Sequence, residues 1–111
     1  MKKNEEIDFQ NQYPVSVALK ILGGKWKIRI ITSLMDGKRR YSELRKSIPD
    51  VSEKMLSLEL KDLEKNKLVA RKSYPTVPPT VEYSLTEYGQ SAKTLIASLN
   101  EWGTNHQQLT K

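Results

Sequence analysis

The feature that most constrains the fold of this chain is a helix break at Pro49-Asp50, which separates two stretches with helical apolar spacing. Proline disfavours a helical conformation in the residue before it, and aspartate favours a turn. A short helix over about residues 41–47 is therefore expected to end at this point. A longer helix over about residues 52–65 is expected to begin just after it.

The longer helix has a capping residue and a single apolar face. The hydroxyl of Ser52 is placed to accept a hydrogen bond from a free backbone N–H of the first helical turn. Leucines then recur at spacings of four and three, at Leu56, Leu60 and Leu63. A short helix, a tight turn and a capped amphipathic helix predict a helix-turn-helix, whose second helix would enter a DNA major groove.

A β-hairpin is predicted directly after the helix-turn-helix. Residues 68–74 and 81–85 have strand composition, and the second stretch alternates apolar and polar side chains. The loop between them, residues 75–80, contains three prolines and should be stiff and extended. Such a hairpin would form a wing, with Lys72 and the tip residues along the minor groove or the DNA backbone. The predicted fold is a mostly α-helical winged helix-turn-helix with a small β-hairpin.

Two further helices are predicted ahead of this unit. The first begins at Pro14 and ends at Gly23-Gly24, because proline suits the first turn of a helix and glycine suits the residue after one. The second covers about residues 25–35 and is expected to be the most buried helix. Trp26 on this helix is interpreted as a core residue rather than a ligand platform.

Basic side chains accompany the second helix and the segment after it. Lys25, Lys27 and Arg29 are expected on or near the exposed side of that helix. The triplet Lys38-Arg39-Arg40 is expected in a loop just ahead of the third helix. It either clamps a DNA phosphate or remains a solvated loop, and the sequence leaves both readings open.

The last predicted helix opens at Thr86, as its N-cap, and stops at Gly103. Gly89 in its first turn is unfavourable for an isolated helix. The apolar residues of this helix step by 4, 3, 4 and 3 along the chain: Tyr88, Ala92, Leu95, Leu99 and Trp102. This heptad-like spacing suits a seam between two subunits at least as well as packing on the domain's own core. We therefore predict a dimer interface from this stripe together with Val15 and Leu19 of the first helix.

The length of 111 residues fits one domain. We predict a flexible arm over residues 1–12, in which Ile7 and Phe9 are able to pack across a dimer, one domain over 13–103, and a tail over 104–111. The sequence contains no cysteine, which excludes thiol redox sensing and thiolate metal sites. No apolar run approaches the ~20 residues that cross a bilayer, and no signal peptide starts the chain, so we expect a cytoplasmic protein without a membrane partner.

The positive charge of the chain is concentrated around the predicted helix-turn-helix. The net charge is +6. Residues 20–72 hold 15 Lys or Arg and 7 Asp or Glu, a balance of +8, whereas the remaining residues hold 4 and 6, a balance of −2. This distribution is the footprint expected for binding a phosphate backbone, although a basic surface without a partner would give the same count.

Other classes of function have less support in the sequence. Catalysis needs a nucleophile with a base, or a pair of carboxylates in a cleft. The single histidine, His106, lies in the patternless tail, and neither a Gly-rich phosphate loop nor a metal-ligand spacing is present. We therefore expect no enzyme activity, no metal and no cofactor. The alternative that stays open is a winged-helix module that binds RNA or a protein partner.

With these elements in place, the chain resembles the HxlR-type family of bacterial winged-helix transcription regulators, from residue 13 to residue 103. The resemblance is carried by the blocks Gly23-Gly24-Lys25-Trp26, Arg40-Tyr41-Ser42-Glu43-Leu44, Ser52-Glu53-Lys54-Met55-Leu56, Pro78-Pro79-Thr80-Val81-Glu82-Tyr83-Ser84-Leu85-Thr86 and Trp102-Gly103. It implies a homodimer that binds an inverted repeat in promoter DNA, with subunit contacts through the N-terminal and C-terminal helices. It names neither an effector nor the sign of regulation.

The chain departs from the family pattern at four positions. Tyr13 stands where many members carry a cysteine just before the Pro-Val pair, so thiol sensing does not carry over. Leu58-Glu59 replaces a basic or amide residue late in the recognition helix, and Thr80 replaces an arginine near the wing tip. Glu59 either accepts a hydrogen bond from a cytosine amino group or points away from DNA. Leu58 either packs under the third helix or contacts thymine methyl groups.

The predicted DNA contacts come from the basic triplet, the two helices of the helix-turn-helix and the wing. They are Arg39, Arg40, Ser42, Ser52, Glu53, Lys54, Ser57, Lys61, Lys72, Thr76 and Thr80. The predicted partners are double-stranded promoter DNA, a second copy of the chain and an unidentified small-molecule effector. The predicted recognition helix is residues 52–65, and the predicted wing is residues 68–85.

Overall fold

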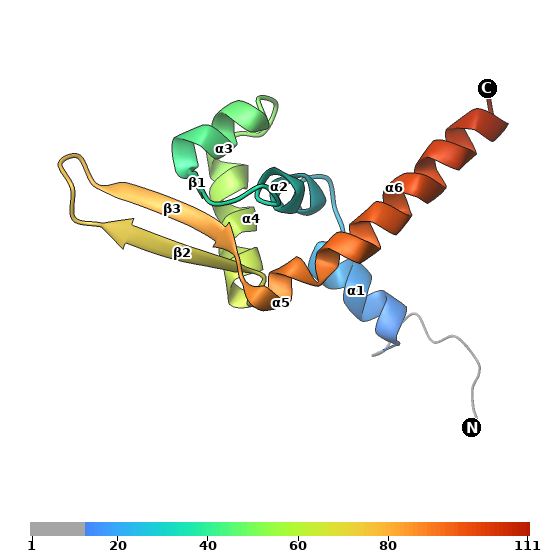
Figure 1. The fold of residues 1–111 in the computed structure, drawn as a ribbon, viewed down its shortest axis with the longest axis horizontal. Helices are drawn as coiled ribbons and strands as arrows, with labels where there is room; N and C mark the ends of the chain where they lie inside the picture. The colour runs from blue at the N-terminus through green and yellow to red at the C-terminus, as the bar shows by residue number, and fades with distance from the viewer. Residues whose placement is uncertain (1–12) are drawn as a thin grey trace.

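The computed structural model describes residues 13–111 and forms a mostly helical body from which a β-hairpin and a long helix project in different directions (Figure 1). Its elements in chain order are α1 (Pro14–Leu22), α2 (Lys27–Ser33), β1 (Arg39–Arg40), α3 (Tyr41–Ser47), α4 (Glu53–Lys65), β2 (Val69–Tyr74), β3 (Thr80–Leu85), α5 (Glu87–Gln90) and α6 (Ala92–Leu109). The three strands form one antiparallel sheet in the order β1-β3-β2. This arrangement confirms the predicted winged-helix fold. The predicted arm with Ile7 and Phe9 lies outside the described residues.

The helix-turn-helix forms where the sequence predicts it. Helix α4 is capped by Ser52, whose Oγ accepts a hydrogen bond of 3.0 Å from the backbone N–H of Met55. The leucine face of α4 is buried in the core together with apolar side chains of α2, α3 and the turn: Ile30, Ile31, Leu34, Leu44, Ile48, Val51, Leu56, Leu60 and Leu63. Burial of this face fixes which side of α4 remains exposed to a partner.

The end of α4 sets the direction of the wing. The N–H of Leu68 donates to the carbonyl of Leu63 at 3.0 Å, and the N–H of Lys67 donates to the carbonyl of Glu64 at 3.0 Å. This hydrogen-bond pattern is a Schellman motif, and Lys67 has the left-handed conformation that the motif requires, with a φ of 67°. Leu63 and Leu68 are both buried, so the turn between α4 and β2 is packed rather than loose.

The predicted hairpin is confirmed, and a third strand joins it. Strands β2 and β3 pair antiparallel, with Arg71 opposite Tyr83 and Lys72 opposite Glu82. The segment Arg39-Arg40, expected in a loop, forms the short strand β1 and pairs with the other edge of β3. Edge pairing satisfies backbone groups that a single hairpin would leave open, and local sequence patterns do not report such a long-range contact.

Helix α2 begins at Lys27 rather than at residue 25, and Lys27 is not on an exposed side. The side chain of Lys27 is only 11% exposed, and its Nζ lies 2.7 Å from Oδ2 of Asp62 and 3.5 Å from Oε1 of Glu59. Helical spacing places Lys27 beside the buried face, and carboxylates on α4 supply the counter-charge. Trp26 packs partly against the core, as predicted, while Lys25 and Arg29 lie over its ring at 4.7 and 5.2 Å.

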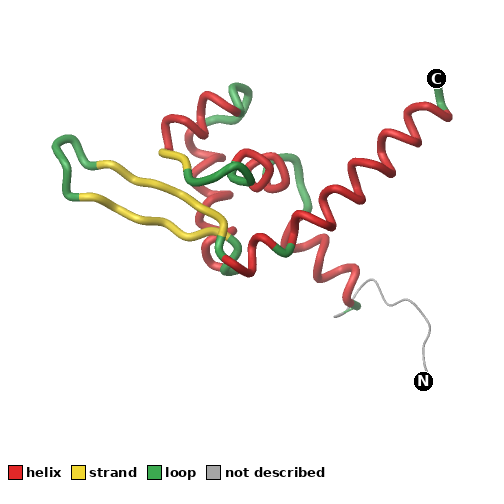
Figure 2. The backbone as a smooth tube through the Cα atoms, in the orientation of Figure 1, coloured by secondary structure: helices red, strands yellow, loops and turns green. Residues whose placement is uncertain are grey.

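The C-terminal part of the chain differs from the single helix predicted between Thr86 and Gly103. Thr86 caps α5, as expected, because its Oγ1 accepts from the N–H of Gly89 at 2.8 Å. The helix is then interrupted at Ser91, and α6 continues through Gly103 to Leu109. One glycine costs a helix interior only about 1 kcal/mol, so Gly103 does not by itself end α6. Figure 2 shows the far half of α6 extending away from the body.

Beyond the predicted end of α6, two aromatic side chains stack on its surface. The rings of Trp102 and His106 have centroids 5.4 Å apart and an interplanar angle of 5°. His106 therefore belongs to a regular helix rather than to a patternless tail. Among residues 13–111, no helix is both long enough and apolar enough to span a bilayer.

Candidate nucleic-acid interface

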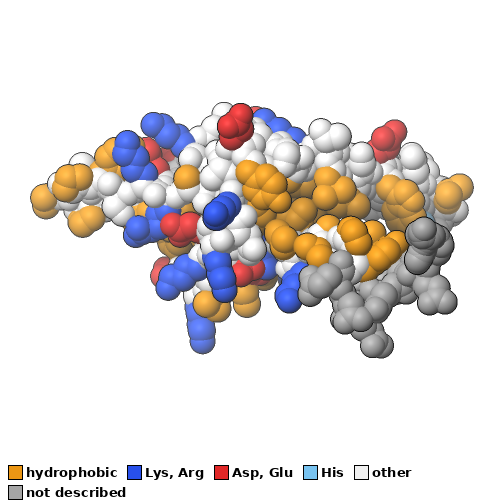
Figure 3. Space-filling model, turned by 90° about the horizontal axis from the view of Figure 1, so that it is seen from below, with side chains coloured by type: hydrophobic (Ala, Val, Ile, Leu, Met, Phe, Trp, Pro, Cys, Tyr) orange, Lys and Arg blue, Asp and Glu red, His pale blue; other side chains and the backbone are white. Residues whose placement is uncertain are grey.

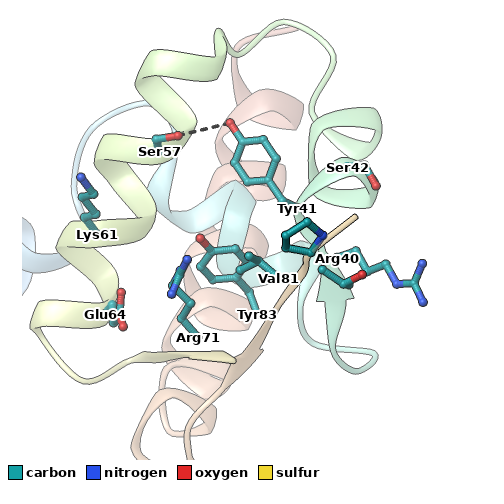
Figure 4. A pocket seen from close by; sticks show the side chains of 11 residues that line it. Arg40, Tyr41, Ser42, Ser57, Lys61, Glu64, Arg71, Val81 and Tyr83 are labelled. Atoms are coloured by element: carbon teal, nitrogen blue, oxygen red, sulfur yellow. Dashed lines mark hydrogen bonds between the residues drawn. The ribbon is translucent and has the colours of Figure 1, made fainter. Parts of the chain in front are cut away.

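An open groove of about 770 Å³ lies between α4, the start of α3 and the wing. Its lining combines basic, hydroxyl and aromatic side chains from all three elements: Arg40, Tyr41, Ser42, Ser57, Lys61, Glu64, Arg71, Pro79, Thr80, Val81 and Tyr83. Figure 4 shows these side chains around the groove. Of the eleven predicted DNA contacts, the structure brings five into this groove, namely Arg40, Ser42, Ser57, Lys61 and Thr80.

Tyr41 joins the two helices of the helix-turn-helix at the upper edge of the groove. Its hydroxyl donates to the backbone carbonyl of Glu53 at 3.2 Å and lies 3.3 Å from Oγ of Ser57 (Figure 4). The first turn of α4 is thus held against the first residue of α3. This contact orients the hydroxyl of Ser57, which is one of the exposed polar groups of the recognition helix.

The wing contributes Arg71, which is not among the DNA contacts predicted from the sequence. Side chains alternate along a strand, so Arg71 lies on the same face of β2 as the buried Val69. Beyond the core, this face turns toward α4, and Arg71 rises between α4 and Tyr83 (Figure 4). Because Leu68, Val69 and Ala70 are all apolar, alternation along the strand did not decide in the sequence whether Arg71 or Lys72 would face α4.

Lys72, which is among the predicted DNA contacts, lies on the other face of the hairpin. Its Nζ is 5.1 Å from the ring centroid of Tyr74, whose hydroxyl donates to Glu82 at 2.8 Å. Lys38 also approaches Glu82, at 3.7 Å. The structure therefore separates two basic faces of the wing, and only the face with Arg71 is turned toward α4.

The remaining predicted contacts of the helix-turn-helix and the triplet lie outside the groove, and three of these four residues have local partners. Arg39 donates from Nε to the carbonyl of Ser33 at 2.7 Å, which ties it to the end of α2. Glu53 lies 3.6 Å from Arg45, and its side chain is 79% exposed. Lys54 is exposed on the first turn of α4, outside the groove. The hydroxyl of Ser52 is used in capping.

The two positions of α4 that depart from the family pattern point in different directions. The Glu59 side chain is 17% exposed and faces Lys27 of α2, so it is turned away from the groove. Leu58 is 52% exposed and is not part of the core under α3. Of the alternatives open in the sequence, the structure favours an internal role for Glu59 and an exposed position for Leu58.

The turn of the helix-turn-helix is fastened to α2 by an exposed ion pair. Both terminal nitrogens of Arg29 donate to the carboxylate of Asp50, at 2.9 and 3.1 Å. The hydrogen bond from Arg29 is the main cause that lowers the pKa of Asp50. This contact holds the turn between α3 and α4 in place, at the end of the unit remote from the wing.

A second, apolar surface lies on the C-terminal side of the molecule. Here α1, α5 and the start of α6 enclose a groove of about 270 Å³, lined mainly by apolar side chains such as Val17, Ile21 and Leu95. Figure 3 shows hydrophobic side chains gathered across this side. The predicted interface residues Val15, Leu19, Tyr88, Leu95, Leu99 and Trp102 are between 41% and 69% exposed. Ala92 differs, because it is buried in the core.

Comparison with known proteins identifies related chains. The model of the HxlR-like helix-turn-helix family matches residues 21–111. An uncharacterized HTH-type transcriptional regulator of Bacillus subtilis, YdeP, is 43% identical over 93 residues, which cover 84% of this chain and 73% of that protein.

Two solved structures share the fold along most of their length. The redox regulator HypR in its reduced form has a TM-score of 0.82 and 39% identity, covering 87% of this chain and 96% of HypR. The reduced form of the transcriptional regulator YodB from B. subtilis has a TM-score of 0.72 and 39% identity, covering 80% and 88% of the two chains.

Proposed function

The chain belongs to the HxlR-like helix-turn-helix family of DNA-binding transcriptional regulators, and we propose that it acts as a homodimer on a near-palindromic operator in double-stranded DNA. The observation that carries this proposal is the basic groove between α4 and the wing. The exposed face of α4 and the Arg71 face of the wing meet in this groove. Such an arrangement is expected if α4 reads bases while the wing contacts the DNA backbone.

The exposed face of α4 is suited to the major groove. Lys54 and Ser57 are both exposed on α4, outside its buried leucine face, and both can form hydrogen bonds with the edges of bases. Leu58 supplies an apolar contact of the kind that suits a thymine methyl group. We assign specificity to these residues of the recognition helix.

The phosphate backbone would pass between the recognition helix and the wing. Arg40, Lys61 and Arg71 line that groove from β1, α4 and β2, and all three side chains are exposed. Arginine and lysine supply the charge-assisted contacts that fix the register of a protein on a duplex. Glu64 is the acidic residue of the lining, so the groove keeps a positive balance.

Dimerisation is proposed through α1 and α6. A chain with leucine and tryptophan side chains this exposed presents more apolar surface than a small isolated domain usually leaves uncovered. Two recognition helices must also be held about one helical turn of DNA apart, at roughly 34 Å, to read two half-sites. Pairing of α6 with its symmetry mate would meet both needs, and a two-fold axis would make the operator nearly palindromic.

The regulator would act in the cytoplasm, where promoter DNA is accessible, as a repressor or an activator. A small-molecule effector remains part of the proposal, and the apolar groove beside α1 is the place where such a molecule would alter the dimer. The sequence contains no cysteine, so a thiol switch is not available to this chain.

The experiment that tests the proposed partner compares duplex DNA, duplex RNA and single strands over a range of salt concentrations. Double-stranded DNA should bind most tightly, with an affinity that falls steeply as salt rises because phosphate contacts release counterions. Preference for RNA, or binding that is weak and insensitive to salt, would favour the alternative of an RNA-binding or protein-binding module.

A further inference from the structure

The hydroxyl of Tyr41 lies between two groups of the recognition helix. Tyr41 is the first residue of α3, and its hydroxyl is 3.2 Å from the backbone carbonyl of Glu53 and 3.3 Å from Oγ of Ser57 (Figure 4). Both partners belong to α4 and are one helical turn apart. Ser57 is exposed and lines the groove proposed for DNA, so its hydroxyl is also available to a partner there.

The two contacts of Tyr41 determine which hydroxyl donates to which. A phenolic hydroxyl carries one proton, and a serine hydroxyl carries one proton and two acceptor lone pairs. The carbonyl of Glu53 can only accept, so it takes the proton of Tyr41. In the contact between the two hydroxyls, Ser57 must therefore donate to the phenolic oxygen. The proton of Ser57 is used within the protein, and only lone pairs are left for a partner.

A hydroxyl that can only accept is selective among the groups of DNA. It cannot donate to a phosphate oxygen, whereas the Lys and Arg side chains of the same groove can do nothing else. In the major groove it matches the amino groups of adenine and cytosine, which are donors. The keto oxygens of guanine and thymine are acceptors themselves and would repel it. Ser57 is therefore suited to a base rather than to phosphate, and to one class of base.

Resting on the proposed function, we infer that Tyr41 is a positioning residue for sequence specificity. It holds Ser57 as a hydrogen-bond acceptor, and Ser57 then selects adenine or cytosine over guanine or thymine at one position of each half-site. Every base pair presents an amino group on one strand and a keto group on the other in the major groove, so this contact reads the orientation of a base pair. Tyr41 acts through Ser57 and needs no contact with DNA of its own.

The test begins with the duplex that the full wild-type chain enriches from a random pool. Ser57→Ala identifies the contacted position, because base preference should weaken there alone, and the wild-type protein should enrich adenine or cytosine at it. Replacing that adenine by purine, or that cytosine by 2-pyrimidinone, removes the amino group without altering the protein. This replacement in one half-site should weaken wild-type binding roughly fivefold relative to its effect on Ser57→Ala, because one neutral hydrogen bond is lost.

Tyr41→Phe removes the phenolic oxygen and keeps the ring. Ser57 regains a free proton, so discrimination between amino and keto bases at its position should fall from about fivefold to below about twofold, while preferences elsewhere in the half-site persist. In a Ser57→Ala background, Tyr41→Phe should cause no further change in preference. Tyr74→Phe is the matched control, because its hydroxyl donates to Glu82 on the other face of the wing, and it should leave every preference unchanged.

Three results would overturn the inference and leave the proposed function standing. They are enrichment of guanine or thymine at the Ser57 position, a half-site without any position that responds to Ser57→Ala, and a loss of affinity in Tyr41→Phe that is equal for all sequences. The last result would give Tyr41 a purely structural role. If the wild-type protein enriches no duplex, the proposed function fails and the inference fails with it.

Discussion

Nζ of Lys27 on α2 lies 2.7 Å from Oδ2 of Asp62 on α4, so an ion pair joins the back of the recognition helix to the helix behind it. Glu59, one turn earlier on α4, lies 3.5 Å from the same ammonium group. The hydrogen bond to Asp62 is the largest cause that raises the pKa of Lys27, and desolvation opposes it. This pair is half-buried, and it stabilises the position of α4 relative to the core.

Lys27→Met should lower the free energy of unfolding by about 1–2 kcal/mol near pH 7, between the values typical of exposed and buried pairs. Because the pKa of Lys27 is raised in the folded state, its contribution is fully present below the unfolded pKa of ~10.4 and is lost as the pH rises through the folded pKa. Urea denaturation of the wild type and Lys27→Met should show a smaller difference in free energy of unfolding at pH 11 than at pH 7.

Arg29→Met is the matched control, because it removes another cation of α2 whose ion pair with Asp50 is exposed. At pH 7, Arg29→Met should lower the free energy of unfolding by less than Lys27→Met does. The pKa of Asp50 is lowered in the folded protein. The stability that the Arg29–Asp50 pair contributes is therefore present above the ordinary carboxyl pKa, and it is lost as the pH falls through the pKa that Asp50 has in the folded protein. A gap between wild type and Lys27→Met that stays constant from pH 7 to pH 11 would contradict the role assigned to Lys27.

Gly89→Ala should destabilise the fold, although helix propensity alone predicts the reverse. A Cβ on Gly89 would lie far inside van der Waals contact with the backbone carbonyl of Leu68, which cannot move as a side chain can. We expect a loss of about 2–3 kcal/mol from this overpacking, which exceeds the propensity gain of about 1 kcal/mol. Thermal unfolding measures the difference.

Gly103→Ala is the same glycine-to-alanine substitution as Gly89→Ala, but it should stabilise the protein. Nothing lies within 4 Å of a Cβ at Gly103, in the middle of α6. Alanine should therefore stabilise the helix by about 0.5–1 kcal/mol. Equal effects of the two substitutions would show that the approach of α5 to Leu68 is looser than the structure has it.

Lys67→Gly should raise the free energy of unfolding by about 0.5–1 kcal/mol. Lys67 has a φ of 67°, a conformation that costs an L-residue roughly 1–2 kcal/mol and a glycine almost nothing, while glycine loses more entropy on folding. Lys65→Gly, two residues earlier and in α4, should instead lower the free energy of unfolding by about 1 kcal/mol. Chemical denaturation of the two variants at one protein concentration compares them directly.

The elements that local patterns determine were predictable from the sequence. The turn at Pro49-Asp50, the caps at Ser52 and Thr86, and the leucine face of α4 each depend on residues within a few positions of one another. The elements that depend on distant contacts were not. Strand β1 exists because β3 offers it an edge, and the interruption at Ser91 accompanies the docking of Gly89 against Leu68.

Only part of the candidate interface was predicted, because the rest also depends on contacts between residues that are distant in the chain. A basic residue on a predicted wing is easy to see, but which of two neighbours faces α4 depends on the register of β2 against the core. Arg71 shares a face with Val69, and Lys72 does not. Glu59 could not be assigned from α4 alone, since its partner Lys27 comes from a helix 32 residues away in the chain.

Arg71→Ala tests the phosphate contact in the groove. If Arg71 meets one phosphate in each subunit, the salt slope of DNA binding should fall by roughly two, at ~0.9 per phosphate. If Arg40, Lys61 and Arg71 each meet phosphate in both subunits, the six contacts should give a wild-type slope of about −5. Filter-binding or anisotropy titrations at several salt concentrations supply these slopes.

Lys20→Ala is the control for charge, because Lys20 is exposed on α1 and lies outside the groove. It removes the same charge and should leave the slope unchanged. Equal reductions for Lys20→Ala and Arg71→Ala would mean that only the overall charge of the chain attracts DNA, and that the groove has no special role.

The measurement that tests the central claim most directly is selection of duplexes by the wild-type chain from a random pool, followed by sequencing. A homodimer that reads DNA through α4 predicts an enriched inverted repeat whose half-site centres lie about one helical turn, roughly 34 Å, apart. Enrichment of a single unrepeated half-site would contradict the dimer, and a pool with no enriched sequence would contradict operator-specific binding by this chain.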